Sequence, residues 1–303
     1  MYEQFSTFAD GLTVAFLDRT IAAGAATTSG YMRGALMLMT AVAAVLLWTR
    51  RLDLWWVVRR FGIAIVVIGL LQVGTYNTYI REPFWTTIPN AIAGGFTGGS
   101  VSVTTARRFD IMSDAASHVV AAADAQATGL WNFRPAFAIA MADGAMKIFI
   151  GICFALSLVA RQATALLISA GPFLLVAAIF DVSRPWVIGW FGRLIALAAW
   201  TLFVTALSEM TLAGSLLFIQ RTAAFAGGLS ERVDGLWKLT IWMLINCAVM
   251  LGLPYYAAFG SGGGGGVQAG AGAAVGLAAA GMGRAAGALR NAAGALRRAG
   301  NRS

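Results

Sequence analysis

Two charged side chains stand four residues apart inside an apolar stretch, where ionised groups are costly. A charge at the centre of a membrane helix costs about 2.5–3.5 kcal/mol on insertion scales. Asp143 and Lys147 would face each other on one side of a helix at this spacing. Such pairs usually face a bundle interior or a water-filled path. The pair therefore indicates a subunit contact or a pore lining, or else a helix at the membrane surface whose two charges are solvated. The residues alone leave these alternatives open.

Glu209 is the only charged residue between Leu194 and Gln220. One interpretation is a proton or ion site, as in a secondary transporter. A relay normally shows several ionisable groups in series, and this segment has one. The pattern therefore favours a contact from Glu209 to a neighbouring helix or subunit, through a backbone amide or an arginine.

Other patterns that resemble reactive or cofactor sites are weak. His118 is the sole histidine, whereas a metal site needs several ligands in a defined geometry. The run from Gly281 to Ala286 loosely imitates a dinucleotide fingerprint, but no strand precedes it. We predict no catalytic residue, no metal site and no cofactor site, and hence a protein that is not an enzyme.

The composition is that of a membrane protein. Apolar residues form 59% of the chain and charged residues 12%, and the mean hydropathy is +0.74. Soluble domains are nearer half apolar and a quarter charged. The apolar excess lies in blocks close to the ~20 residues that a helix needs to cross the hydrocarbon layer.

These blocks predict an all-α polytopic membrane protein with five or six transmembrane helices. Cys153 and Cys247 lie inside such blocks, which indicates buried packing residues and not a disulfide framework. The apolar segments are Tyr31–Trp48, Phe61–Ile80, Pro135–Ala160, Gln162–Phe180, Leu194–Gln220 and Leu239–Phe259.

The segments divide the chain into five parts. Residues 1–30 form an amphipathic N-terminal segment on the membrane surface, because Phe5, Phe8, Leu12 and Phe16 recur at helical spacing. Residues 31–80 hold two transmembrane helices. Residues 81–134 are too polar and too long for a turn, so we expect a separate domain that is mostly helical after residue 105. A transmembrane bundle occupies 135–259, and a flexible basic tail occupies 260–303.

The tail is rich in glycine and alanine and has no acidic side chain. Its arginines have three candidate roles: binding of anionic lipid headgroups, contact with a nucleic-acid backbone, or a topology and solubility anchor. The residues concerned are Arg284, Arg290, Arg297, Arg298 and Arg302.

Basic residues also predict the orientation. Arg50, Arg51, Arg59 and Arg60 crowd the first short connection, which should face the cytoplasm. The N-terminus and the 81–134 domain would then be periplasmic. The side that holds the tail depends on whether Pro135–Ala160 spans.

The stretch from Ile168 to Leu207 resembles the signature of the TrbL/VirB-six family. Gly171 and Pro172 lie inside an apolar helix, Phe180 and Arg184 stand at its end, and Trp190 opens the next helix. In this chain Pro185 and Trp186 follow the arginine, where the family usually has a less rigid turn. The order of spans, polar domain and basic tail is similar as well.

The resemblance implies a channel or scaffold subunit of a type IV secretion (conjugation) system in the bacterial inner membrane. Implied partners are membrane lipids, further copies of the chain in a homo-oligomer, cytoplasmic ATPases, and stalk and pilus proteins. A translocated protein or single-stranded DNA would be a transient contact. It also implies an assembly role for Gly171, Pro172, Phe180, Arg184 and Trp190. The alternative is a stand-alone secondary transporter that uses Asp143 and Glu209.

Overall fold

The computed structural model describes residues 1–49, 54–96, 105–127, 133–221 and 227–259, and every regular element in these ranges is helical. The all-α class is therefore confirmed. The elements are α1 (Tyr2–Trp48), α2 (Leu54–Leu71), α3 (Val73–Tyr76), η1 (Asn77–Arg81), η2 (Pro83–Thr87), α4 (Ile88–Phe96), α5 (Thr105–Asp124), α6 (Phe133–Ala177), α7 (Arg184–Arg221) and α8 (Leu229–Phe259).

Four of these helices, α1, α6, α7 and α8, are long and apolar enough to cross a membrane. A bent pair of helices, Trp55–Leu71 and Val73–Ala91, meets the same criteria as one broken span. The four long helices contain 31 to 47 residues, or about 47 to 70 Å at 1.5 Å per residue. A hydrocarbon layer is about 30 Å thick. Each helix therefore reaches well beyond one bilayer.

The third and fourth apolar segments form one helix and not two. α6 runs through Arg161 without a break and ends at Ala177. Arginine is a good helix former, and its charge here is paired with Asp10. The single charge of Arg161, between two apolar blocks, therefore does not mark a turn. The count of six separate segments was wrong, and five is the largest number of spans that the described helices allow.

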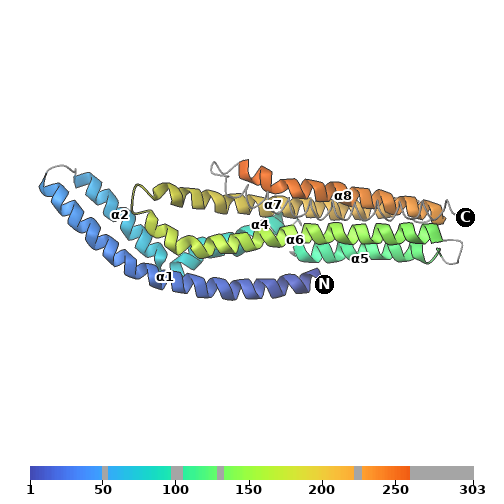
Figure 1. Cartoon of the computed structure of the whole chain (residues 1–303), viewed down its shortest axis with the longest axis horizontal. Coiled ribbons are helices and arrows are strands. Elements are labelled where there is room, and N and C mark those ends of the chain that lie inside the picture. Colours follow the sequence, from blue (N-terminus) through green and yellow to red (C-terminus); the bar gives the residue numbers. More distant parts are fainter. Residues whose placement is uncertain (50–53, 97–104, 128–132, 222–226, 260–303) are drawn as a thin grey trace, which may run out of the picture.

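The N-terminal segment is helical as expected, but it does not end near residue 30. α1 continues unbroken from Tyr2 to Trp48 and bows along the bundle (Figure 1). Phe5, Phe8 and Leu12 are more than half exposed on its outer side.

The second apolar segment is interrupted, where an uninterrupted span was expected. Gln72 adopts an extended conformation, with φ −64° and ψ 129°, and the helices on either side of it meet at 85°. The chain then stays helical from Val73 to Phe96. Residues 81–96 are therefore an extension of this broken element.

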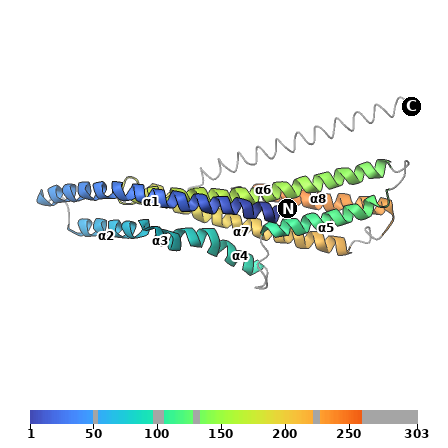
Figure 2. The ribbon, with the colours of Figure 1, turned by 90° about the horizontal axis from the view of Figure 1, so that it is seen from below.

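All the long helices lie along one axis (Figures 1 and 2). One end holds α2 and the C-terminal end of α1, and the other end holds α5. α5 confirms the helix expected after residue 105. It does not fold apart from the bundle, because Phe109 and Met112 share a core with α6, α7 and α8.

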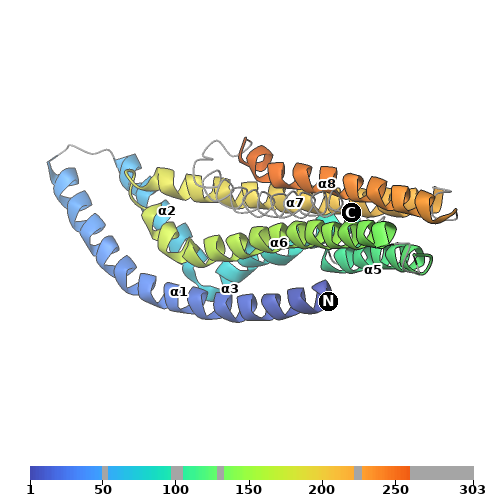
Figure 3. The ribbon, with the colours of Figure 1, turned by 45° about the vertical axis from the view of Figure 1, so that its right-hand side comes forward.

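The bundle has two apolar cores, one toward each end. The first is built from α5, α8, the N-terminal part of α6 and the C-terminal part of α7. The second is built from α1, α2, the bent segment after it, and the other parts of α6 and α7. Figure 3 shows α6 and α7 running through both ends of the molecule. Between the cores lie the charged residues described next.

Candidate functional site: a polar cavity beside a belt of ion pairs

The first half of α1 presents three acids to the rest of the bundle. Glu3, Asp10 and Asp18 are seven and eight residues apart, close to two helical turns, so they share one face. Each meets an arginine from a different element: Arg107 of α5 at 3.5 Å, Arg161 of α6 at 2.8 Å and Arg81 of η1 at 2.6 Å. These ion pairs hold α1 in register against three elements.

Asp110 of α5 secures the start of α1. Its carboxylate accepts hydrogen bonds from the backbone amides of Tyr2 and Glu3, at 2.9 and 2.8 Å, and from the N-terminal ammonium. First-turn amides have no partner within their own helix, and a carboxylate there also complements the helix dipole. Burial opposes ionisation, but these hydrogen bonds hold the pKa of Asp110 below its usual range.

Arg108 and Glu209 form an ion pair between α5 and α7. The Arg108 Nε lies 2.8 Å from a Glu209 carboxylate oxygen, and Arg108 is 1% exposed. This geometry agrees with the expectation that Glu209 contacts a neighbouring helix or subunit, through a backbone amide or an arginine. Asp143 bonds to Lys147 on its own helix at 2.7 Å. Asp143 and Glu209, the two acids of the transporter alternative, are thus each paired with a basic side chain. Neither carboxylate is left unpaired to bind a transported ion.

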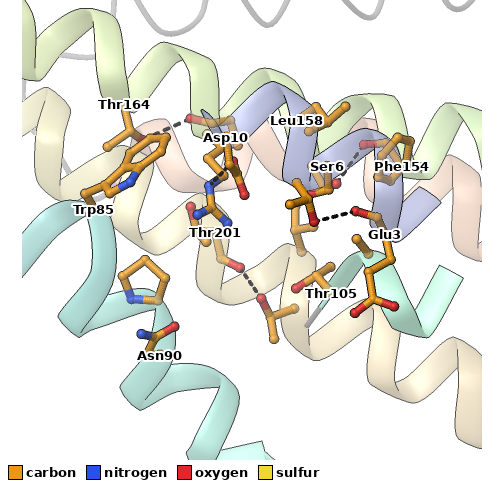
Figure 4. A pocket seen from close by; sticks show the side chains of 18 of the residues that line it. Glu3, Ser6, Asp10, Trp85, Asn90, Thr105, Phe154, Leu158, Thr164 and Thr201 are labelled. Carbon is orange, nitrogen blue, oxygen red and sulfur yellow. Dashed lines mark hydrogen bonds and ion pairs between the residues drawn. The ribbon is translucent and has the colours of Figure 1, made fainter. Parts of the chain in front are cut away.

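We call the ion pairs between helices the ion-pair belt: Glu3–Arg107, Asp10–Arg161, Asp18–Arg81 and Glu209–Arg108. A polar cavity of about 250 Å³ opens beside this belt, where α1, η2, α4, α5, α6 and α7 meet. Figure 4 shows the side chains that line it: Glu3, Ser6 and Asp10 come from α1, Trp85 from η2, Asn90 from α4 and Thr201 from α7. The Arg161 guanidinium stacks on the Trp85 ring, 4.8 Å from its centre. No sequence motif indicated this cavity, because its lining comes from six separate elements.

The Gly171–Pro172 pair is covered by side chains from two other helices, α3 and α7. Proline has no N–H, so the Ile168 carbonyl one turn earlier lacks its helical donor. The Tyr76 hydroxyl of α3 donates to that carbonyl, and Trp190 Nε1 of α7 donates to the Leu167 carbonyl at 2.8 Å.

Gly171 is required at this point by space. A Cβ there would lie 1.9 Å from the Tyr76 hydroxyl and 2.7 Å from the Trp190 ring, and one at Gly24 of α1 would lie 3.3 Å from Phe173. The close approach at Gly171 is therefore made by aromatic side chains. Tyr76 and Gly24 carry no motif that would have identified them.

The other residues of the predicted motif lie at the turn between α6 and α7. The Arg184 amide donates to the Phe180 carbonyl at 3.0 Å. Arg60 of α2 donates to the Ile179 carbonyl at 2.6 Å and pairs with Asp181. A basic side chain thus satisfies a carbonyl freed at the end of α6. Arg50, Arg51 and the tail arginines fall outside the described residues.

The comparisons with known proteins agree with the resemblance. A family model described as TrbL/VirB6 plasmid conjugal transfer protein matches residues 34–257. Protein VirB6 of Agrobacterium fabrum is 27% identical over 203 residues, which is 64% of this chain and 68% of the relative. Protein VirB6 of Rhizobium radiobacter is 24% identical over 204 residues, or 66% and 69% of the two chains. Since the family model covers well over half of the 303 residues, this chain belongs to the TrbL/VirB6 family of plasmid conjugal transfer proteins.

Proposed function

We propose that the chain is a non-catalytic channel or scaffold subunit of a type IV secretion apparatus in the bacterial inner membrane. Family membership makes it a membrane subunit of a type IV secretion or conjugation system that works with other subunits. The finer role rests on one observation. The described acids of the belt are engaged in holding long helices together. This is the chemistry of a rigid framework.

The helices have the dimensions of a framework that continues outside the bilayer. α6 has 45 residues, or about 68 Å at 1.5 Å per residue, which is roughly twice the ~30 Å thickness of one hydrocarbon layer. More than half of α6 would therefore extend beyond this layer. Such a subunit can transmit a force or a displacement from the membrane to its partners. The partners that the resemblance implies are the secretion ATPases on one side, and stalk and pilus proteins on the other.

The exposed apolar surface supports lipid contact and self-association. In the second half of α1, Met37, Leu38 and Val45 are all more than 60% exposed. Such side chains suit a bilayer or a neighbouring helix. We infer that copies of the chain assemble around a path for the translocated protein or single-stranded DNA.

The orientation follows from the arginines and from the alternation of helices. Arg60 touches the α6–α7 turn, so the first connection and this turn lie at the same end of the molecule, on the cytoplasmic side by the positive-inside rule. With a periplasmic N-terminus and five crossings, α8 returns to that side. The basic tail is then cytoplasmic.

Single-cysteine labelling tests this topology on a background without Cys153 and Cys247. Ser117 of α5 and Val182 of the α6–α7 turn are both exposed and form a matched pair. An impermeant maleimide should label Ser117→Cys in cells with a permeabilised outer membrane, and Val182→Cys only after lysis. The reverse pattern would overturn the proposed orientation.

The subunit role itself is tested by substrate transfer. Deletion of the gene should abolish transfer, and the wild-type chain should restore it while co-purifying with other secretion subunits. Normal transfer without the chain would contradict the proposal.

A further inference from the structure

The polar cavity beside the ion-pair belt presents mainly hydrogen-bond acceptors. Seven hydroxyl groups from four helices line it, and five of them donate their proton to a carbonyl of their own helix. The donors are Thr7, Ser157, Thr164, Thr201 and Thr205, at 2.7 to 2.9 Å. A hydroxyl that has used its proton offers only lone pairs to the cavity. These five hydroxyls therefore favour a ligand that brings the donors.

The lining also carries a net negative charge. Its ionised members are Glu3, Asp10 and Arg161. Asp10 neutralises Arg161 at 2.8 Å, and the arginine is further held against Trp85. Glu3 forms its ion pair with Arg107 of α5 at 3.5 Å, and Arg107 is not part of the lining.

An anion would fit this cavity poorly. It would meet the carboxylates of Glu3 and Asp10, which repel negative charge. Thr164 and Thr205 are 6% and 4% exposed, so their oxygens are well removed from bulk solvent, where electrostatic interactions with a ligand are stronger.

We propose that this cavity binds a small organic cation with several N–H donors, namely a guanidinium or a primary ammonium group. Hydroxyl oxygens of α6 and α7 would accept its hydrogen bonds, and the Glu3 carboxylate would supply the charge. A volume of about 250 Å³ suits a group of this size. The cation can come from a free metabolite-sized amine or from an arginine or lysine side chain of a peptide.

The test uses the full-length protein purified in detergent. Binding of radiolabelled agmatine, which carries both cationic groups, is measured by equilibrium dialysis. Methylguanidinium and its neutral isostere methylurea serve as competitors. We expect methylguanidinium to displace agmatine at a concentration at least tenfold lower than methylurea. Equal potency of the two, or displacement by acetate at constant ionic strength, would overturn the proposal.

Variants locate the site. Thr201→Val combined with Thr205→Val removes two acceptors without changing shape, and Glu3→Gln removes the charge. Each should weaken agmatine binding at least tenfold. Thr211→Val is the control, because Thr211 is on the same helix, is 7% exposed and donates to the Leu207 carbonyl at 2.7 Å, but does not line the cavity. It should bind within twofold of wild type.

Gel filtration shows whether the double variant has folded. Glu3 is 43% exposed by its side chain, so Glu3→Gln should fold in any case and keeps the test decisive. Wild-type binding by Glu3→Gln or by a folded double variant would place the agmatine elsewhere and refute the assignment.

Two further experiments show whether the cation comes from a free amine or from the side chain of a peptide. An arginine residue blocked at both ends, as a peptide mimic, is compared with agmatine, and the fragment that binds at least tenfold more tightly identifies the source. A protein that lacks residues 268–303 is tested beside the full chain, because the tail carries arginines of its own. Binding only after truncation would identify the tail as the cation donor. No binding by either protein would refute the proposal.

Discussion

At Gly171 a single methyl group decides whether three helices can meet. The Cβ of an alanine would come within 1.9 Å of the Tyr76 hydroxyl and 2.7 Å of the Trp190 ring, and both aromatic groups are fixed by hydrogen bonds to α6. We expect Gly171→Ala to destabilise the purified protein by about 1–3 kcal/mol, as overpacking does. Gly171→Leu should prevent assembly with other subunits.

Gly189 on α7 provides the control, because a Cβ there would meet no atom within 4 Å. Gly189→Ala should leave thermal stability unchanged or raise it slightly, since alanine is the better helix former. Membrane abundance, thermal unfolding in detergent and substrate transfer are measured for all three variants. A Gly171→Ala protein as stable as Gly189→Ala would show that Tyr76 and Trp190 do not pack as described.

The two acids that stand inside apolar segments should differ sharply in their contribution to stability. Glu209→Leu leaves the buried guanidinium of Arg108 without its partner, and arginine cannot shed its charge. Loss of one member of a buried pair costs about 3–5 kcal/mol. Asp143→Leu removes a pair with Lys147, whose side chain is 56% exposed, so about 0.5 kcal/mol is lost.

Denaturant unfolding in detergent compares these two acid-to-leucine variants directly. Equal losses of unfolding free energy would mean that Arg108 finds another partner or solvent. This ranking of the two acids was not available from the sequence. Arg108 is 101 residues from Glu209 in the chain, whereas Asp143 and Lys147 are four residues apart.

At the scale of whole elements, hydropathy predicted the helices well and their ends poorly. The apolar blocks gave α1, α6, α7 and α8 because apolar length alone determines whether a segment can span. The break at Gln72 has no proline or charge to announce it, and Arg161 looked like a boundary but is not one. At Arg161 the outcome depends on a contact with a distant element, Asp10 of α1.

One signal for these contacts was present in the sequence but was not used. The acids of the first half of α1 recur at seven and eight residues, which places them on one face, opposite the exposed Phe5, Phe8 and Leu12. An acidic stripe on an otherwise apolar helix indicates basic partners facing it. The identity of those partners, Arg81, Arg107 and Arg161, required the fold.

The register of α6 against α8 can be tested through the two cysteines. Cys153 and Cys247 are buried and free, and they belong to the same apolar core, Cys153 from α6 and Cys247 from α8. Diamide should accept the two thiol hydrogens and leave a disulfide between the helices. With a protease site inserted between residues 222 and 226, the cleaved halves should stay together on a non-reducing gel.

Cys247→Ser is the control and should separate into two fragments after the same treatment. Separation of the oxidised wild-type halves, with both thiols still reactive after denaturation, would contradict the α6–α8 register. The buried position of both cysteines confirms the sequence interpretation of packing residues. Their pairing across two helices was not predicted, because 94 residues separate them.

At the scale of the whole molecule, the merging of two predicted segments into α6 changes the topology. Six crossings would return the chain to the side where it began, whereas five place its two ends on opposite sides. Within the described residues, five is the larger count that the helices allow. In the proposed orientation with five crossings, the tail arginines would lie on the side of Arg60, in agreement with the preference of basic residues for the cytoplasm.

Removal of residues 268–303 should therefore leave the membrane bundle intact and affect only transfer. The tail begins beyond a run of glycines at Gly262–Gly266, which couples it weakly to α8. Its composition offers little apolar surface to bury, so ordering it needs a partner. Anionic lipid attracts each basic residue near the surface by about 1 kcal/mol, and nucleic acid offers a comparable charge partner.

Replacing the tail arginines by glutamine removes their charge but keeps the length of the tail. This variant distinguishes an effect of the charge from an effect of the segment itself. If charge carries the role, the neutralised protein should lose as much transfer as the truncated one at matched membrane abundance. The residues are Arg284, Arg290, Arg297, Arg298 and Arg302. Full transfer by the neutralised protein, with failure of the truncated one, would exclude charge as the cause. A truncated protein that disappears from the membrane would show instead that the tail is part of the fold, because a segment that stabilises the bundle must bury surface against it.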